Sequence, residues 1–387
     1  MSTQHDGVGQ QAYDVSRRDW TIVLFGFAAI TGIAIQARGA LIASFQREFG
    51  VSEAYLGLVA PVASAAVLAT VLTIGFSAGR IDQRRWLLIG VGGSIIGFLL
   101  MAISPIYLIF LGMFGFRNLA AGVVSGLSRP LLSHLYPSRR GRIFNLNEMV
   151  WAFGAAIGPL LVTAVLLFGS WRWTYVLIAI LMVPIFVALM FLRAPSQTSN
   201  ERSFELRELP GLLDRPVITV MALSIVFTAG IEGVFFTWLP FYAGQFVSEG
   251  FANALLSLFL IAYVPGRFVF SRLVTRYRPT TLVFVSAIGS LLILSVVFTA
   301  PTRVSLPIGF AMVGFLVSGF FPTLLAWGTN EYPEISAPVN AIAVTAISAG
   351  MFTSPAIVGV IADVFSIEQA MFFQLALLGG LLILTLL

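Results

Sequence analysis

The chain contains no cysteine and no lysine, and it is poor in charge of either sign. Its 387 residues include 22 basic residues, all of them arginine, and only two histidines, His5 and His134. The absence of cysteine excludes disulfide bonds and thiolate metal sites. There is no cluster of metal-binding residues and no phosphate-binding loop, so the sequence indicates neither an enzyme nor a bound metal or other cofactor.

Charged residues make up only 10% of the chain, whereas soluble proteins use about a quarter. Hydrophobic residues make up 58% of it, and the mean hydropathy is +0.95. Much of the protein surface must therefore face a solvent other than water, which predicts a lipid bilayer.

Apolar runs long enough to cross a membrane recur along the whole chain. A helix needs about 20 mostly apolar residues to span the hydrocarbon layer. The sequence predicts an all-α polytopic membrane protein with twelve transmembrane helices, near residues 20–46, 53–78, 86–104, 107–135, 143–169, 172–193, 216–244, 251–274, 281–300, 306–329, 339–362 and 368–387.

Two polar segments interrupt this pattern. Residues 1–19 form a polar tail, and a polar stretch divides the spans into two sets of six. We expect four parts, namely a cytoplasmic tail 1–19, an N-terminal six-helix domain 20–193, a cytoplasmic linker 194–215 and a C-terminal six-helix domain 216–387.

The arginines predict the orientation in the membrane. If the first span runs outward, fifteen of the 22 arginines lie in cytoplasmic segments, and only Arg47, Arg172 and Arg303 lie in outer loops. Arginine is enriched on the cytoplasmic side of membrane proteins, so both termini are expected inside a multi-pass cell-membrane protein. The arginines form no single patch, which argues against nucleic-acid binding.

The two halves of the sequence repeat one another. A single ungapped offset of 196 residues pairs Arg80 with Arg276, Tyr136 with Tyr332, Gly154 with Gly350, Pro159 with Pro355, and Gln36 with Glu232. Six spans per half place both repeats in the same orientation, with a central cavity between them that suits alternating access.

Several short motifs occur within this pattern. In the loop at 75–85, Gly75, Arg80 and Arg84 match the signature G-x-L-x-D-R-x-G-R-R, although glycine stands at the Asp position and the acid is Asp82 instead. The span at 143–169 contains Gly154-x-x-x-Gly158-Pro159. The sequences 171–173 (Trp-Arg-Trp) and 319–323 (Gly-Phe-Phe-Pro-Thr) complete the set.

These motifs resemble the major facilitator superfamily over essentially the whole chain. The spans at 216–362 are similar to sugar–proton symporters of the fucose permease type, and Arg38 and Arg117 are similar to arginines of organic-anion symporters. The resemblance implies a conformational latch at Gly75, Arg80, Asp82, Arg84 and Arg276, and a pivot at Gly154, Gly158, Pro159 and Pro355. Ordinary cytoplasmic charge and ordinary helix packing are the alternative interpretations.

Glu232 is the most informative ionisable residue. It lies near the middle of the predicted span 216–244, one turn after Thr228. A charge at the bilayer centre costs about 3 kcal/mol, so such residues face the bundle interior and have a partner. Glu232 is either a proton-coupling or substrate-binding carboxylate, or one member of a structural Glu–Arg pair.

The other polar residues within spans offer further candidates. Arg38, two residues after Gln36, could bind an anionic solute or pair with Glu232, because a guanidinium suits a carboxylate or phosphate. Arg117 is a second candidate anion contact. Arg129 is expected to pair with Glu148, either as a structural ion pair or in gating or coupling. The candidate Asn145 shares the helical face of Glu148. A structural role is favoured for Arg267, and an interfacial one for His134.

Together these features predict a secondary transporter that moves a small polar or anionic organic solute, by proton-coupled symport and without a cofactor. The alternative is a proton-coupled efflux antiporter of hydrophobic or drug-like compounds. The expected partners are the small-molecule substrate and the bilayer, and the expected state is a monomer. The sequence alone predicts neither the solute nor the direction of transport.

Overall fold

The computed structural model describes residues 3–76, 82–136, 139–192, 211–212, 214–332 and 335–386, and throughout these ranges the regular structure is helical. Twelve segments are long and apolar enough to cross a membrane, which confirms the predicted all-α fold. They are Arg17–Ala40, Glu53–Val71, Gln83–Ala102, Tyr107–Leu135, Arg142–Phe168, Arg172–Phe191, Pro216–Ala243, Glu249–Leu273, Pro279–Thr299, Ser305–Glu331, Pro338–Val364 and Ile367–Leu386.

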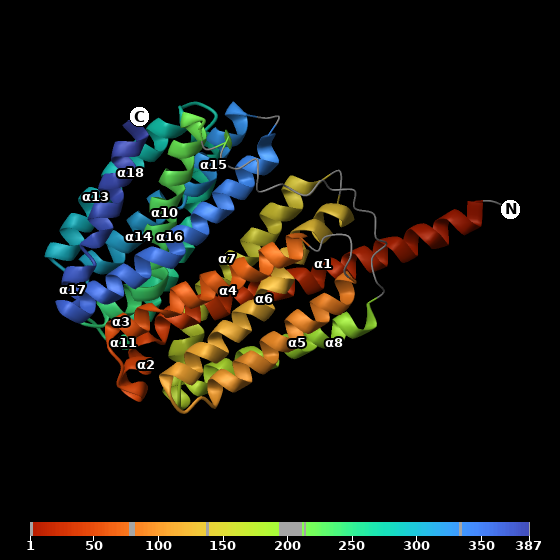
Figure 1. Cartoon of the computed structure of the whole chain (residues 1–387), viewed down its shortest axis with the longest axis horizontal. Coiled ribbons are helices and arrows are strands. Elements are labelled where there is room, and N and C mark those ends of the chain that lie inside the picture. The colour runs from red at the N-terminus through yellow and green to blue at the C-terminus, as the bar shows by residue number, and fades with distance from the viewer. Residues whose placement is uncertain are drawn as a thin grey trace. The chain divides into compact units, whose positions relative to one another are not determined.

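The helices follow these spans closely, but several spans consist of two consecutive helices (Figure 1). The helices of the first six spans are α1 (Thr3–Ala40), α2 (Ile42–Phe49), α3 (Glu53–Gly57), α4 (Val59–Phe76), α5 (Gln83–Ala102), α6 (Tyr107–Leu135), α7 (Arg140–Phe168) and α8 (Arg172–Phe191). The remaining helices are α10 (Pro216–Ala243), α11 (Glu249–Ile261), α12 (Tyr263–Leu273), α13 (Pro279–Thr299), α14 (Ser305–Val317), α15 (Phe320–Glu331), α16 (Ser336–Val364), α17 (Ile367–Ala370) and α18 (Phe373–Leu386).

The chain forms two compact units. Unit 1 contains Met1–Ala34, Ala66–Ala155 and Arg172–Ser203, and unit 2 contains Ile35–Ala65, Ala156–Trp171 and Phe204–Leu387. The end of the first span, the start of the second and the end of the fifth are thus grouped with the second half of the sequence. The predicted domains 20–193 and 216–387 remain predictions, and most of the predicted linker 194–215 lies outside the described residues.

In unit 1, small residues allow helix backbones to approach each other. α5 packs between α6 and α8, as Figure 1 shows. Gly154 of α7 faces the backbone of Ala29 in α1, and Gly32 of α1 faces the backbone of Trp151 and Ala155 in α7. Glycine at such positions lets two membrane helices pack without intervening side chains.

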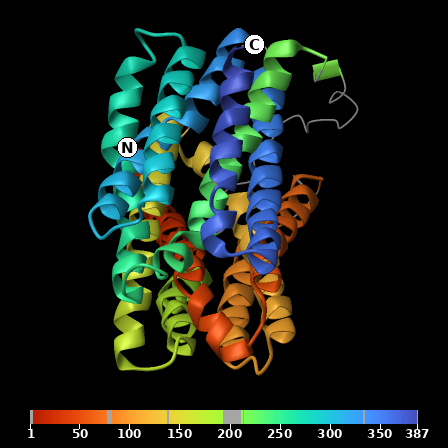
Figure 2. The same ribbon diagram turned by 90° about the vertical axis from the view of Figure 1, so that its left-hand side faces the viewer.

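Unit 2 repeats this arrangement around α10. α16 and α18 pack along α10, and α13 packs on α18 (Figure 2). Gly350 of α16 faces the backbone of Val226 in α10. Gly350 and Val226 follow Gly154 and Ala29 by 196 and 197 residues respectively, so the same close contact occurs once in each unit, as an internal repeat requires.

A second contact also recurs in both units, at the ends of spans that are predicted to face the cytoplasm. In unit 1 the guanidinium of Arg17 lies 4.1 Å from the ring centroid of Tyr136. In unit 2 the guanidinium of Arg215 lies 4.6 Å from the ring centroid of Tyr332, the residue that follows Tyr136 by 196 positions. Cation–π stacking therefore joins the start of the first span of each repeat to the end of its fourth.

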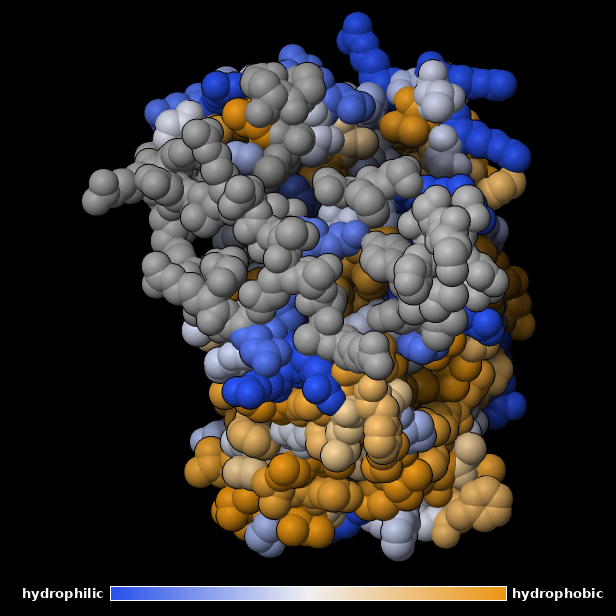
Figure 3. All heavy atoms as spheres, turned by 90° about the vertical axis from the view of Figure 1, so that its right-hand side faces the viewer, coloured by the Kyte–Doolittle hydropathy of each residue, from blue (hydrophilic) through white to orange (hydrophobic). Residues whose placement is uncertain are grey.

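Exposed side chains along the spans are largely apolar. Figure 3 shows many of them gathered on one face. Large hydrophobic residues that are more than half exposed occur on most of the long helices, for example Ile89, Leu108, Phe153, Ile180, Val285, Ile308 and Val360. Water would disfavour such a surface, whereas lipid chains solvate it, as a membrane-spanning protein requires.

The contact between Gly154 and Ala29 can be tested by adding one methyl group. A Cβ atom at Gly154 would overlap the Ala29 carbonyl, so Gly154→Ala forces two backbones apart. We expect a loss of about 1–3 kcal/mol, the usual cost of overpacking, seen as a lower unfolding temperature in detergent. Gly112→Ala in α6 is the matched control, because open space surrounds that position. Equal unfolding temperatures for the two variants would contradict this account of the helix contact.

Candidate functional site

Glu232 is the one charged residue of α10, a 28-residue helix. Its neighbours Ile231, Val234 and Phe235 are fully buried, whereas Glu232 itself is half-buried. Its Oε1 accepts a hydrogen bond from the hydroxyl of Tyr263, at 3.0 Å. The structure therefore places a hydrogen-bonded carboxylate in the middle of an apolar helix.

Arg267 supplies the nearby positive charge. It lies one helical turn after Tyr263, and its guanidinium carbon is 5.5 Å from the Tyr263 ring centroid. Tyr263 forms the direct bond to Glu232, and the guanidinium of Arg267 lies near the ring of that tyrosine. We call Glu232, Tyr263 and Arg267 the Glu232 cluster. It resembles the expected structural Glu–Arg pair, except that a tyrosine bridges the two charges.

Arg38 contacts the same helix from the end of α1. It is buried, and its Nη2 donates to Thr237 Oγ1 at 3.2 Å. Gly39 permits this approach, because it faces the backbone carbonyl of Phe236. Gln36 is fully buried, and within the described part of the chain its carboxamide has no hydrogen-bond partner. Gln36 and Arg38 thus bring polar atoms to the outer half of α1 in unit 2.

Arg117 has a different environment, in unit 1. Its guanidinium lies 4.6 Å from the ring centroid of Phe98 in α5 and donates to Asn118 Oδ1 at 3.1 Å. Gly97 of α5 faces the Cα and Cβ atoms of Arg117, so the side chain begins at a tight helix contact. These contacts tie Arg117 to α5, and its role as an anion contact remains a prediction.

The predicted pair of Arg129 and Glu148 is confirmed. Arg129 Nη2 lies 3.1 Å from Glu148 Oε1 and joins α6 to α7 within unit 1. Both side chains are substantially exposed, at 59% and 43%, so the pair adds little to stability. The side chain of Asn145 lies outside the described residues.

At the start of α5, Arg84 caps the end of a neighbouring helix. Arg84 donates from Nε to the carbonyl of Leu189 at 3.2 Å and from Nη2 to the carbonyl of Met190, at the end of α8. Asp82 caps the start of α5 by accepting from the backbone N–H of Arg85. These carbonyls lack helical partners, so a cation there is favourable.

The remaining residues of the predicted latch are less informative. Gly75 lies in the last turn of α4, Arg80 is outside the described residues, and Arg276 is exposed in the turn after α12. The latch itself therefore remains a prediction.

The predicted pivot residues lie at close contacts. Gly158 and Pro159 are buried in α7, and the carbonyl of Pro159 accepts from Thr163 Oγ1. The carbonyl of Pro355 in α16 accepts from Trp238 Nε1 at 2.9 Å. In both cases the acceptor is the carbonyl of the proline itself. Each proline also lacks the N–H that would bond to the preceding helical turn. A pivoting role is a further step that remains a prediction.

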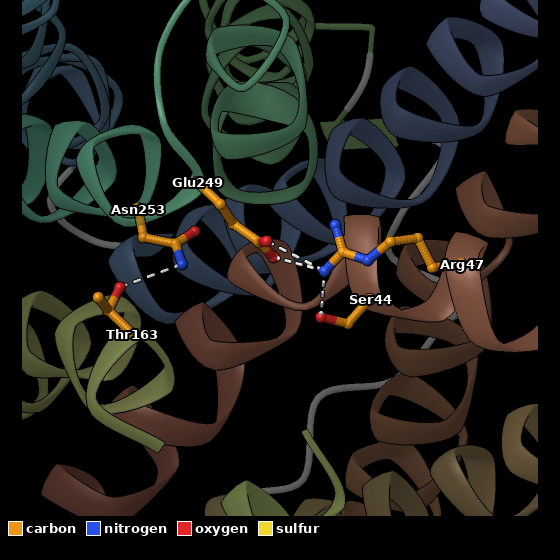
Figure 4. Close-up of polar contacts among 5 residues, drawn as sticks. All are labelled: Ser44, Arg47, Thr163, Glu249 and Asn253. Atoms are coloured by element: carbon orange, nitrogen blue, oxygen red, sulfur yellow. Dashed lines mark hydrogen bonds and ion pairs between the residues drawn. The ribbon is translucent and has the colours of Figure 1, made fainter. Parts of the chain in front are cut away.

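Polar contacts at the outer ends of the spans were not anticipated from the sequence. Figure 4 shows Arg47, at the end of α2, bonding both carboxylate oxygens of Glu249 at 3.0 Å and Ser44 at 3.3 Å. In the same view Asn253 of α11 donates to Thr163 of α7 at 3.2 Å. These bonds join segments of unit 2 that are far apart in the sequence.

The described residues form no candidate metal site. Across the described ranges, no group of three or more His, Cys, Asp or Glu side chains is placed to hold a metal ion.

Twelve apolar spans, internally repeated contacts and a half-buried carboxylate within one span define a polytopic membrane transporter. The family model of the Major Facilitator Superfamily matches residues 22–247, and the chain belongs to this family. It is therefore a secondary transporter embedded in a membrane, and its family is one of transporters rather than enzymes.

Among curated proteins, the chain is 23% identical over 333 residues to a TsgA homolog of Erwinia tasmaniensis, covering 82% of this chain and 81% of that protein. It is 27% identical over 248 residues to Protein TsgA of Shigella flexneri, which is 61% of this chain and 62% of that protein.

The fold is similar to solved transporter structures. A bacterial homolog of the human lysosomal transporter Spinster matches with a TM-score of 0.81 at 13% identity, covering 96% of this chain and 97% of the other. A D-xylose-proton symporter matches with a TM-score of 0.73 at 17% identity, covering 95% and 96%. At such low identities the likeness shows the fold alone.

The ion pair of Arg47 and Glu249 should contribute little energy. Its side chains are 60% and 36% exposed, and exposed pairs are worth at most about 1 kcal/mol. A double-mutant cycle of Arg47→Ala and Glu249→Ala, followed by unfolding in detergent, should give a coupling energy within that limit. A coupling of several kcal/mol would show that the pair is far better shielded from water than the structure indicates.

Proposed function

We propose that the protein takes up a small polar or anionic organic solute together with protons, and that Glu232 carries the proton. The observation that carries this proposal is the position of Glu232, half-buried and hydrogen-bonded within an otherwise uncharged helix. Intramembrane carboxylates of this kind mark proton and substrate pathways.

The Glu232 cluster suits a proton carrier better than a permanent ion pair. Tyr263, which is nearly fully buried, offers Glu232 one hydrogen bond, and the Arg267 guanidinium lies 5.5 Å from the centroid of the Tyr263 ring. A carboxylate held by a direct bidentate arginine would be costly to protonate, because protonation would leave a buried cation unpaired. Glu232 can gain or lose a proton while Arg267 keeps its contact with the tyrosine ring.

Arg38 is the best candidate for the solute contact. Its guanidinium carries several donors, and its Nη2 bonds the Thr237 hydroxyl. Arginine binds planar anions such as carboxylates through paired donors. Gln36, buried two residues earlier, would add a carboxamide that both donates and accepts.

The solved structures of similar fold include proteins whose titles give related activities. One is a D-xylose-proton symporter, one a fucose:proton symporter and one a nucleoside transporter. They support proton-coupled transport of hydroxyl-rich solutes as the first class to test. We further propose a cell-membrane location with both termini in the cytoplasm, a monomer, and the proton gradient as driving force without a bound cofactor.

Glu232→Gln tests the proton carrier directly, because it keeps the shape of the side chain and removes its proton exchange. Purified protein is placed in weakly buffered liposomes, and external pH is followed as sugars, nucleosides and organic acids are added. We expect one solute class to raise the external pH with the wild type, and at least about a tenfold smaller signal with Glu232→Gln.

Glu331→Gln is the matched control, since Glu331 is an exposed residue at the end of α15. It should transport like the wild type. An unchanged signal in Glu232→Gln would remove Glu232 from the proton pathway. Acidification on solute addition would instead favour proton-coupled antiport.

A further inference from the structure

Two of the interrupted spans in unit 2 have a proline at the third position of the helix that follows the break. α11 ends at Ile261 and α12 begins at Tyr263, and Pro265 is the third residue of α12. Because proline has no N–H, the carbonyl of Ile261, four residues earlier, lacks its helical donor. Pro322 does the same to the carbonyl of Ser318, where α14 gives way to α15.

The two breaks lie against each other. Gly266, next to Pro265, faces the Ser318 hydroxyl and the Phe315 carbonyl so closely that a Cβ atom would overlap both. One turn further, Phe270 packs on Gly319. A movement at one break therefore has to be accommodated at the other, because the space beside Gly266 and Gly319 is already filled by groups of the opposite break.

Tyr263 connects the first break to the carboxylate. It is the first residue of α12, it is 5% exposed, and its hydroxyl bonds Glu232. Its ring contacts Arg267, which belongs to the same half-helix. The bond from α10 thus reaches α12 at the point where the chain is least constrained by helical hydrogen bonds.

We propose that Tyr263 is a positioning residue that couples the charge on Glu232 to the movement of α12 about the break at Pro265. This inference rests on the proposed proton-carrying role of Glu232. An ionised carboxylate accepts a short, charge-assisted bond that is about twice as strong as a neutral one. Protonation of Glu232 weakens its bond to Tyr263, and α12 then moves together with Arg267 and the adjoining break before α15.

Few other charges compete for this role. α16 and α18, which also pack on α10, bring Ser354 close to Gly230 and the amide of Gln374 to the Ile231 carbonyl. Arg38, in the last turn of α1, bonds Thr237 of α10, five residues after Glu232. The other charged residues of the elements that pack on α10 lie in the end turns of their helices: Arg47 and Glu48 of α2, Glu249 of α11, Glu331 of α15 and Asp363 of α16.

The first test is Tyr263→Phe, which keeps the ring and its contact with Arg267 and removes only the hydroxyl. In liposomes we expect proton-driven solute accumulation to fall about tenfold to a hundredfold, the effect of losing one bond to a charged group. Solute counterflow, which needs no proton gradient, should stay within about twofold. Tyr242→Phe, at another buried tyrosine, is the control and should leave both unchanged.

The second test measures the break itself and needs no solute. The chain has no cysteine, so Phe251→Cys in α11 and Phe268→Cys in α12 provide two specific sites for spin labels, both on exposed positions. Seventeen helical residues separate them by about 25 Å. We expect this distance to change between acidic and mildly alkaline buffer, and the change to disappear in Tyr263→Phe and in Glu232→Gln. Thr281→Cys with Thr299→Cys, in the uninterrupted α13, should show no change.

These two tests separate the inference from the proposed function. A distance that does not respond to pH, or that responds equally in Tyr263→Phe, overturns the role of Tyr263 even if Glu232→Gln abolishes proton uptake. Undiminished accumulation by Tyr263→Phe overturns it as well. If the wild type moves no protons with any solute, the proposed function fails, and the spin-label distances alone decide whether Tyr263 transmits the charge of Glu232.

Discussion

Inside the hydrocarbon layer no water is available to a polar group, so each one must find its partner within the protein. This constraint explains why the membrane spans of the described chain are helical, since a helix pairs its own backbone N–H and C=O groups. It also explains the small residues at helix contacts. With no water to drive association, helices gain from close packing, and Gly154 against Ala29 and Gly350 against Val226 allow it in both units.

The same constraint makes the polar exceptions informative. Glu232 accepts a hydrogen bond from Tyr263, and Arg38 donates one to Thr237. The carbonyl of Pro355 accepts one from Trp238. The prolines at 265 and 322 release carbonyls at the two breaks that pack together through Gly266. Unit 2 thus places a titratable group beside two breaks in its spans, between α11 and α12 and between α14 and α15. A bundle with a purely structural role does not need this arrangement.

The sequence predicted the fold well because spans and their boundaries follow from hydrophobicity alone. The starting point of α1 differs, since the helix begins at Thr3, in a polar stretch with no apolar pattern to predict it. The pair of Arg129 and Glu148 was predictable from matching depth in neighbouring helices. Tyr263 was missed as the partner of Glu232, because a tyrosine in an apolar span has many possible neighbours. Pro265 and Pro322 lie at two of the breaks, but the prolines at 130, 159, 184, 240 and 355 lie inside continuous helices, so proline alone could not predict the breaks.

The central claim is that Glu232 changes its protonation while it remains inside the membrane-spanning part of the protein. Infrared difference spectroscopy between acidic and mildly alkaline buffer, on protein in lipid, measures this directly through the C=O band of a protonated carboxyl group. The account predicts a band that disappears on alkalinisation in the wild type and is absent from Glu232→Gln. The same band in both proteins would show that the titrating carboxyl group is a different one, and would contradict the account.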